Sequence, residues 1–160
     1  NASFDRAFID RFSSNSPSKV WACSINDIDW LERGFTSSKQ ELLCYWHGFY
    51  FDAHRAMNDV DALIHLLTFD TGLERPLLEL IKNSNKSEFV IYAEHFKYDP
   101  VKKDILKGNK YRWNPNDKIW FKKVNLDELE HEKDWLTATI YDQVFKGRVE
   151  EIIPSNKYKL

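Results

Sequence analysis

The chain has 160 residues, of which 42% are apolar, 30% charged and 15% aromatic, and this balance excludes a wholly disordered protein. The formal net charge of −2 excludes a globally basic surface, and the lack of a long apolar run predicts that no segment spans a membrane. The two cysteines, Cys23 and Cys44, exclude a disulfide scaffold and a cysteine-based zinc site. The low cysteine content and the polar N-terminal segment, which is unlike a signal peptide, favour a cytoplasmic location. A chain that begins without Met is typical of a fragment or of a processed product.

Residues 1–84 are predicted to be mostly helical, from hydrophobic periodicity and from the positions of capping residues. The predicted elements are a helix over Ser3–Phe12 with Phe4, Ala7, Phe8 and Phe12 on one face, a loop over Ser13–Ser18, a strand over Val20–Ser24, and helices over Ile25–Arg33, Ser38–His47, Arg55–Leu67 and Leu73–Asn83. Gly34 and Gly48 follow two of these helices as C-terminal caps, and Pro76 lies in the first turn of the last. The segment Asn83–Ser87 has the composition of a linker.

Residues 88–142 are predicted to form a small α+β module, followed by a tail over residues 143–160. The elements of the module are a strand over Phe89–Ala93, a helix that begins at Asp99-Pro100 and ends at Gly108, strands over Tyr111–Asn114 and Ile119–Val124, and a helix over Leu126–Tyr141.

The distribution of charged residues also divides the chain into regions. Residues 1–81 hold 7 basic and 12 acidic side chains, residues 82–123 hold 11 and 5, and residues 124–160 hold 5 and 8. A basic block between two acidic blocks indicates at least two units with different partners, although a solvated lysine-rich surface explains the same pattern.

The clearest chemical motif is His54-Arg55-Ala56-Met57-Asn58-Asp59. His54 lies in the loop before a predicted helix and Asp59 lies in its first turn, so both side chains can point at one place. A carboxylate can hold a divalent cation and an imidazole can take a proton from a bound water. The structural alternative is that Asp59 complements the helix dipole and His54 caps the turn. Asp5, in the first turn of the first predicted helix, allows the same two interpretations.

Together, Asn1-Ala2-Ser3-Phe4-Asp5 and the His54 motif resemble the second and third motifs of the DEDDh 3′→5′ exonucleases, the superfamily of the DNA polymerase III epsilon subunit. Further segments that carry the resemblance are Trp21-Ala22-Cys23, Leu42-Leu43 and Gly48-Phe49. Segments Lys103–Lys107, Tyr111–Asn114 and Lys118–Trp120 resemble a small C-terminal module attached to some bacterial epsilon-like exonucleases. The resemblance extends over about Asn1–Tyr141.

This resemblance implies an α/β fold, with a truncated ribonuclease-H-like exonuclease portion followed by the small module. The implied activity is metal-dependent hydrolysis of phosphodiester bonds at DNA or RNA 3′ ends, with two Mg²⁺ or Mn²⁺ ions as cofactors. Asp5 and Asp59 are then expected to be metal ligands and His54 the general base. A polymerase and a second copy of the chain are the protein partners to consider, and no membrane is involved.

The superfamily's first motif, Asp-x-Glu, occurs nowhere in the 160 residues, where the nearest patterns are Asp27-Ile28-Asp29 and Asp59-Val60-Asp61. We therefore expect the C-terminal part of an exonuclease domain that is inactive by itself. The alternative is a non-catalytic module that binds nucleic acid or another protein.

Basic and aromatic residues alternate around the Pro115–Asp117 turn. The candidate nucleic-acid-binding residues are Lys110, Arg112, Trp113, Lys118, Lys122 and Lys123. Aromatic side chains on so small a hairpin can equally belong to the core, and this alternative stays open for Tyr111, Trp113 and Trp120.

Overall fold

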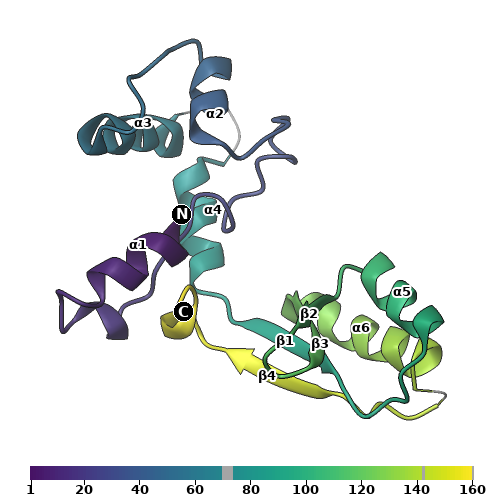
Figure 1. The fold of residues 1–160 in the computed structure, drawn as a ribbon. Coiled ribbons are helices and arrows are strands. Elements are labelled where there is room, and N and C mark those ends of the chain that lie inside the picture. The colour runs from purple at the N-terminus through teal and green to yellow at the C-terminus, as the bar shows by residue number, and fades with distance from the viewer. Residues whose placement is uncertain (70–73, 142, 160) are drawn as a thin grey trace. The chain divides into compact units, whose positions relative to one another are not determined.

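The structure is a computed structural model that describes residues 1–69, 74–141 and 143–159 (Figure 1). The chain divides into two units, of which the first comprises Asn1–Lys86 together with the C-terminal residues from Pro154 on. The second unit is Ser87–Ile153. The boundary between Lys86 and Ser87 falls inside the segment whose composition indicated a linker. The chain combines helices with one antiparallel sheet, as the sequence predicted at the coarse level.

The first unit is helical among its described residues. Its elements are α1 (Ala2–Ile9), the 3₁₀ turn η1 (Ser16–Ser18), α2 (Gln40–Trp46), α3 (Ala56–Thr68), α4 (Pro76–Ser84) and the 3₁₀ turn η2 (Pro154–Asn156). The predicted helices at α2, α3 and α4 are confirmed, although Leu73, the predicted start of the last, lies outside the described residues. Pro76 opens α4, where its missing N–H leaves no hydrogen bond unmade. The buried core of this unit consists of Ile28, Trp30, Leu43, Cys44, Ala62, Leu66 and Leu80.

The buried face of α1 differs from the predicted one. Phe4, Phe8 and Phe12 are 75%, 58% and 75% exposed, whereas Ala2 and Arg6 are buried. The Arg6 guanidinium donates to the backbone carbonyls of Pro17, Ser155 and Lys157 over 3.1, 2.8 and 2.6 Å. Because these bonds satisfy a buried charge and three carbonyl groups, they orient the helix against its own apolar periodicity.

The predicted strand over Val20–Ser24 and the predicted helix over Ile25–Arg33 are both wrong. This segment consists of turns and irregular backbone, and Gly34 closes it with a left-handed φ of +88°. The Asp27 carboxylate accepts the Cys23 N–H at 2.8 Å, and the Asn83 amide donates to the Asp27 carbonyl at 3.1 Å. Bonds to side chains, one of them remote in sequence, thus replace part of the hydrogen-bond ladder that a helix or strand needs.

The second unit has the element order β1 (Glu88–Ala93), α5 (Pro100–Gly108), β2 (Arg112–Asn114), β3 (Ile119–Val124), α6 (Leu126–Thr139) and β4 (Arg148–Ile152). The four strands pair antiparallel in the order β2-β3-β1-β4, so β3 lies between β1 and β2. This is the split βαβ arrangement. The predicted elements from β1 to α6 are confirmed, and the Asp99 carboxylate caps α5 by accepting the Val101 N–H.

The expectation of a tail over residues 143–160 is wrong. Residues Arg148–Ile152 form the edge strand β4 on β1, and Lys157 and Tyr158 are buried in the first unit. The sequence RVEEI is too polar to have indicated a strand. An edge strand with one face exposed to solvent needs few apolar side chains.

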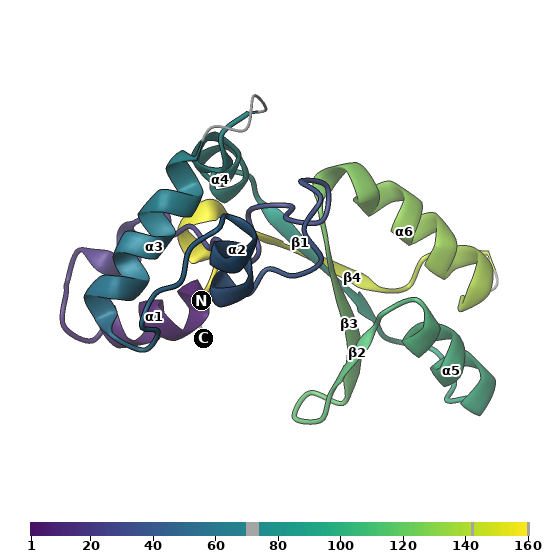
Figure 2. The ribbon, with the colours of Figure 1, turned by 90° about the horizontal axis from the view of Figure 1, so that it is seen from above.

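One face of the sheet carries the core of the second unit. Ile91, Ala93, Trp120 and Val124 of the central strands pack with Leu106 of α5 and with Leu129, Leu136 and Ile140 at and beyond α6. Both helices therefore cover the same face of the sheet (Figure 2). Among the described residues, no helix combines the length and the apolar composition needed to cross a membrane.

Candidate functional site

The loop before α3 brings His54 to Asp59. His54 has a left-handed φ of 68°, and its backbone N–H donates to the Asp59 Oδ1 over 3.4 Å. Asp59 lies in the first turn of α3, and the His54 side chain is 94% exposed. The two residues of the motif therefore lie together at the start of one helix, with the imidazole open to water.

Neighbouring side chains hold this loop in place. The Asp52 carboxylate pairs with the Arg55 guanidinium at 2.7 Å, and the Asn58 amide donates to the Asp52 carbonyl at 3.1 Å. Gln40 at the start of α2 donates from Nε2 to the Asp59 carbonyl at 2.6 Å. These contacts fix the direction in which α3 begins, and with it the position of Asp59.

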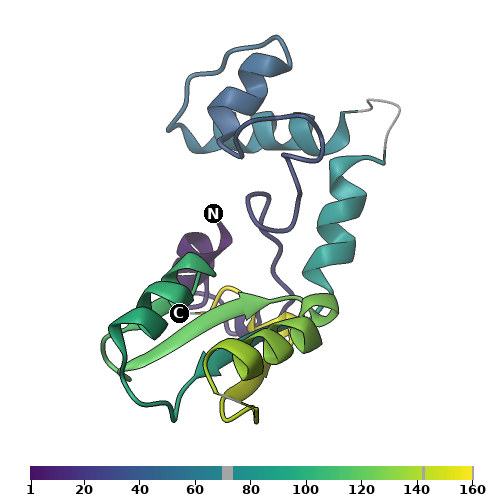
Figure 3. The ribbon, with the colours of Figure 1, turned by 90° about the vertical axis from the view of Figure 1, so that its right-hand side faces the viewer.

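Asp5 lies apart from this pair. It is on α1, 58% exposed, and its carboxylate is 3.6 Å from the ammonium of Asn1. Figures 1 and 3 both show α1 well away from α3 within the first unit. The structure therefore brings together two of the three predicted site residues, and not the third.

The described residues do not form the two-cation site that the exonuclease resemblance implies. Nowhere in residues 1–69, 74–141 and 143–159 do three or more His, Cys, Asp or Glu side chains come close enough to hold a metal ion. Hard divalent cations need several oxygen ligands, and a pair of cations needs shared carboxylates. Asp5 and Asp59 alone do not fit such a site, and we derive no chemical step through a metal.

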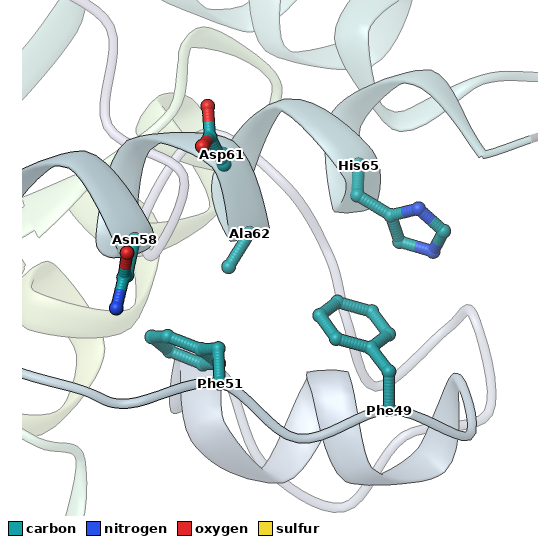
Figure 4. Close-up of a pocket in the computed structure, with 6 residues that line it drawn as sticks. All are labelled: Phe49, Phe51, Asn58, Asp61, Ala62 and His65. Atoms are coloured by element: carbon teal, nitrogen blue, oxygen red, sulfur yellow. The ribbon is translucent and has the colours of Figure 1, made fainter.

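An open pocket of about 250 Å³ lies beside the motif, and its lining residues are Phe49, Phe51, Asn58, Asp61, Ala62 and His65. Figure 4 shows the rings of Phe49 and Phe51 below α3, with Asn58 pointing toward Phe51 and the Asp61 carboxylate turned away from both rings. The His65 and Phe49 rings meet edge to face at 4.6 Å.

This pocket was not predicted from the sequence, although Phe49 and Phe51 alternate just before the His54 loop. Alternate residues of an extended segment point to the same side, so the two rings form one apolar surface next to the helix that carries Asp59.

The residues predicted to bind nucleic acid separate between two faces of the sheet. Trp113 packs on Trp120 with ring centroids 5.4 Å apart, and Lys122 pairs with Glu132 of α6. Trp113 and Lys122 thus lie on the side of the helices, and Lys122 is engaged in an ion pair of low exposure. Strand alternation places Arg112 and Lys123 on the opposite face.

The other members of that set lie outside the strands or in the core. Lys110 and Lys118 are exposed at the ends of β2 and β3, with left-handed φ values of 65° and 54°. Tyr111 and Trp120 are buried, which supports the core interpretation for these two aromatics, whereas Trp113 remains 46% exposed.

Comparisons with known proteins add no relatives. No protein-family model matches the chain, and searches of curated proteins and of solved structures found no significant match.

Proposed function

We propose that the chain is the C-terminal part of a metal-dependent 3′→5′ exonuclease of the DEDDh type, which removes nucleotides from the 3′ ends of DNA or RNA. The observation that carries the proposal is the juxtaposition of His54 and Asp59 at the start of α3. The first unit is then the C-terminal portion of a ribonuclease-H-like domain, and the second unit follows it in the sequence.

The geometry around His54 suits a general base. The imidazole is exposed to water, and an imidazole is the side chain that proteins most often use to take a proton from a reacting group. The Glu41 carboxylate lies 3.8 Å from His54 Nε2, where it can stabilise the imidazolium that forms when His54 takes the proton from an attacking water.

Asp59 also has an electrostatic reason for its place. A carboxylate in the first helical turn lies at the positive end of the helix dipole, which is a favourable electrostatic position. Because no Asp-x-Glu motif occurs in these 160 residues, the proposed activity requires an Asp-x-Glu segment in addition to them.

The test is nucleotide release from a 3′-labelled oligonucleotide, measured with the full-length natural protein. We expect Asp59→Asn and His54→Ala each to lower turnover by about 10² to 10⁴-fold. Asp61→Asn is the matched control for the first variant, because Asp61 lies on the same helix and is exposed. His131→Ala, at an exposed position of α6, is the control for the second.

Near wild-type release in the Asp59 and His54 variants contradicts the assignment. Equal losses in the variants and in their controls also contradict it, because the effect is then structural. A natural protein that binds oligonucleotides but releases no nucleotide favours the alternative of a non-catalytic binding module.

A further inference from the structure

The sheet face opposite the helices carries a second set of aromatic side chains. Since Ile91 and Ala93 of β1 point toward α5 and α6, Tyr92 between them points to the opposite face. On β3, Trp120 and Lys122 face the helices, so Phe121 also points to the opposite face. Tyr92 and Phe121 lie on the two central strands and are both partly exposed.

The strand register joins these rings into one row across all four strands. Phe121 is paired with Arg112 of β2 on one side and with Tyr92 of β1 on the other, and Tyr92 is paired with Arg148 of β4. Directly opposed side chains in antiparallel strands lie about 5 Å apart, so the four neighbours form a continuous surface. We name Arg112, Phe121, Tyr92 and Arg148 the cross-sheet row.

We propose that the cross-sheet row binds single-stranded nucleic acid, with unpaired bases stacked on Phe121 and on the Tyr92–Arg148 pair. Aromatic rings on the central strands of a four-stranded sheet provide flat surfaces for bases, and guanidinium planes stack on bases in the same way. The proposal is independent of the exonuclease activity, because this surface belongs to the second unit.

The contacts at one end of the row prepare such a stack. The Arg148 guanidinium lies over the Tyr92 ring with its central carbon 3.9 Å from the ring centroid. The Glu150 carboxylate orients both, since it accepts the Tyr92 hydroxyl at 3.1 Å and pairs with Arg148 at 3.2 Å. The ring and the guanidinium are therefore held in place before any ligand arrives.

The charges along the row favour a polyanion that enters from β2. Arg112 is exposed, at the end of the row away from Glu150. Lys123, on the same face of β3, lies 3.5 Å from the Glu88 carboxylate, so its charge is partly compensated. At the other end the charge of Arg148 is compensated by Glu150 at 3.2 Å and by Glu94 at 3.8 Å. Phosphate groups are therefore expected on the Arg112 side.

The experiment measures the fluorescence anisotropy of a fluorescein-labelled oligothymidylate of about 15 nucleotides, a length within reach of a single-domain site. The full chain is titrated at low salt in the presence of EDTA, so that no nuclease activity contributes. Tyr92→Leu and Phe121→Leu keep an apolar side chain in the sheet and remove the ring. Each is expected to weaken binding about tenfold or more, as loss of one stacked base predicts.

Tyr98→Leu is the matched control, because Tyr98 is 70% exposed and lies outside the strands of the same unit. The Tyr98→Leu variant should bind the oligonucleotide as tightly as the wild-type chain. Arg112→Gln is expected to lower affinity and to reduce the dependence of affinity on salt. Circular dichroism establishes that each variant is folded.

Three results overturn the proposal: no binding by the wild-type chain at low salt, equal binding by the Tyr92, Phe121 and Tyr98 variants, or binding of a duplex as tight as that of the single strand. The first leaves a protein partner as the occupant of this face. The second moves the binding site to another surface, such as the turn between β2 and β3. None of the three bears on the exonuclease proposal, which concerns cleavage.

Discussion

A buried ion pair gives the sharpest stability prediction. The Lys157 ammonium lies 2.8 Å from the Asp27 carboxylate, both side chains are 3% exposed, and Lys157 also donates to the Asn83 carbonyl at 3.0 Å. This pair joins the C-terminal residues of the first unit to its turn-rich segment. Lys157→Met removes the positive charge and leaves the Asp27 carboxylate buried with the Cys23 N–H as a remaining donor.

Removing one member of a buried pair lowers the free energy of unfolding by about 3–5 kcal/mol. With a denaturant dependence of about 2 kcal/mol per molar urea, the unfolding midpoint should fall by roughly 2 M. Urea titration followed by tryptophan fluorescence measures this shift. The matched control is Lys159→Met, at an exposed lysine two residues away, which should change stability by about 0.5 kcal/mol or less.

The double variant Lys157→Met/Asp27→Leu separates a charge effect from a loss of packing. If most of the lost stability comes from the unpaired charge of the buried Asp27 carboxylate, the double variant should recover much of it, because no uncompensated charge remains. A Lys157→Met variant as stable as the Lys159→Met control refutes the reasoning. The reasoning is also refuted if the free energy of unfolding falls in the double variant by more than the sum of the two decreases in the single variants.

Three further predictions concern pH, association and activity. Burial and the nearby His65 lower the pKa of His47, so the unfolded chain binds the proton more tightly and the free energy of unfolding should fall as pH decreases below 6.5. His47→Phe should flatten this dependence in urea titrations between about pH 7 and pH 5, and an unchanged pH slope contradicts the assignment. The exposed rings of Phe4, Phe8 and Phe12 should make the chain self-associate, so light scattering should report a mass above that of a monomer, which Phe8→Ser lowers. With Mn²⁺, the 160-residue chain alone should release no more nucleotide from a 3′-labelled oligonucleotide than a heat-treated control, because it lacks the two metal-binding carboxylates of the Asp-x-Glu motif. Release that a chelator abolishes contradicts this prediction.

Elements governed by local chemistry could be predicted from the sequence. Helix α5 follows from the Asp99 cap and Pro100, and α6 begins with a capping box in which Asn125 and Glu128 exchange hydrogen bonds. The β2–β3 hairpin follows from turn residues between two aromatic strands. In each case the deciding contacts lie within a few residues of one another.

Elements governed by remote contacts could not be predicted. The orientation of α1 is decided by bonds from Arg6 to carbonyls near residue 17 and beyond residue 154, and no periodicity reports such partners. The Asp27 segment is likewise fixed by Lys157, which lies 130 positions away. Strand β4 forms because β1 offers an edge, and its own polar sequence gives little sign of it.

The same distinction applies to the sites. His54 and Asp59 are five positions apart and come together through one loop, so the motif predicted their proximity. Tyr92 and Phe121 come together only through the register of β1 and β3, which the two strand sequences do not specify. Lys122 looked like its neighbours Lys118 and Lys123 in the sequence, but alternation along β3 directs it toward Glu132.

The most direct test of the exonuclease proposal is the rate of nucleotide release from a 3′-labelled single strand, compared between Asp59→Asn and Asp61→Asn in the full-length natural protein. The two variants make the same chemical change, two positions apart on one helix. We predict a loss of about 10² to 10⁴-fold for Asp59→Asn and near wild-type release for Asp61→Asn. Equal rates in the two variants contradict a catalytic role for the start of α3.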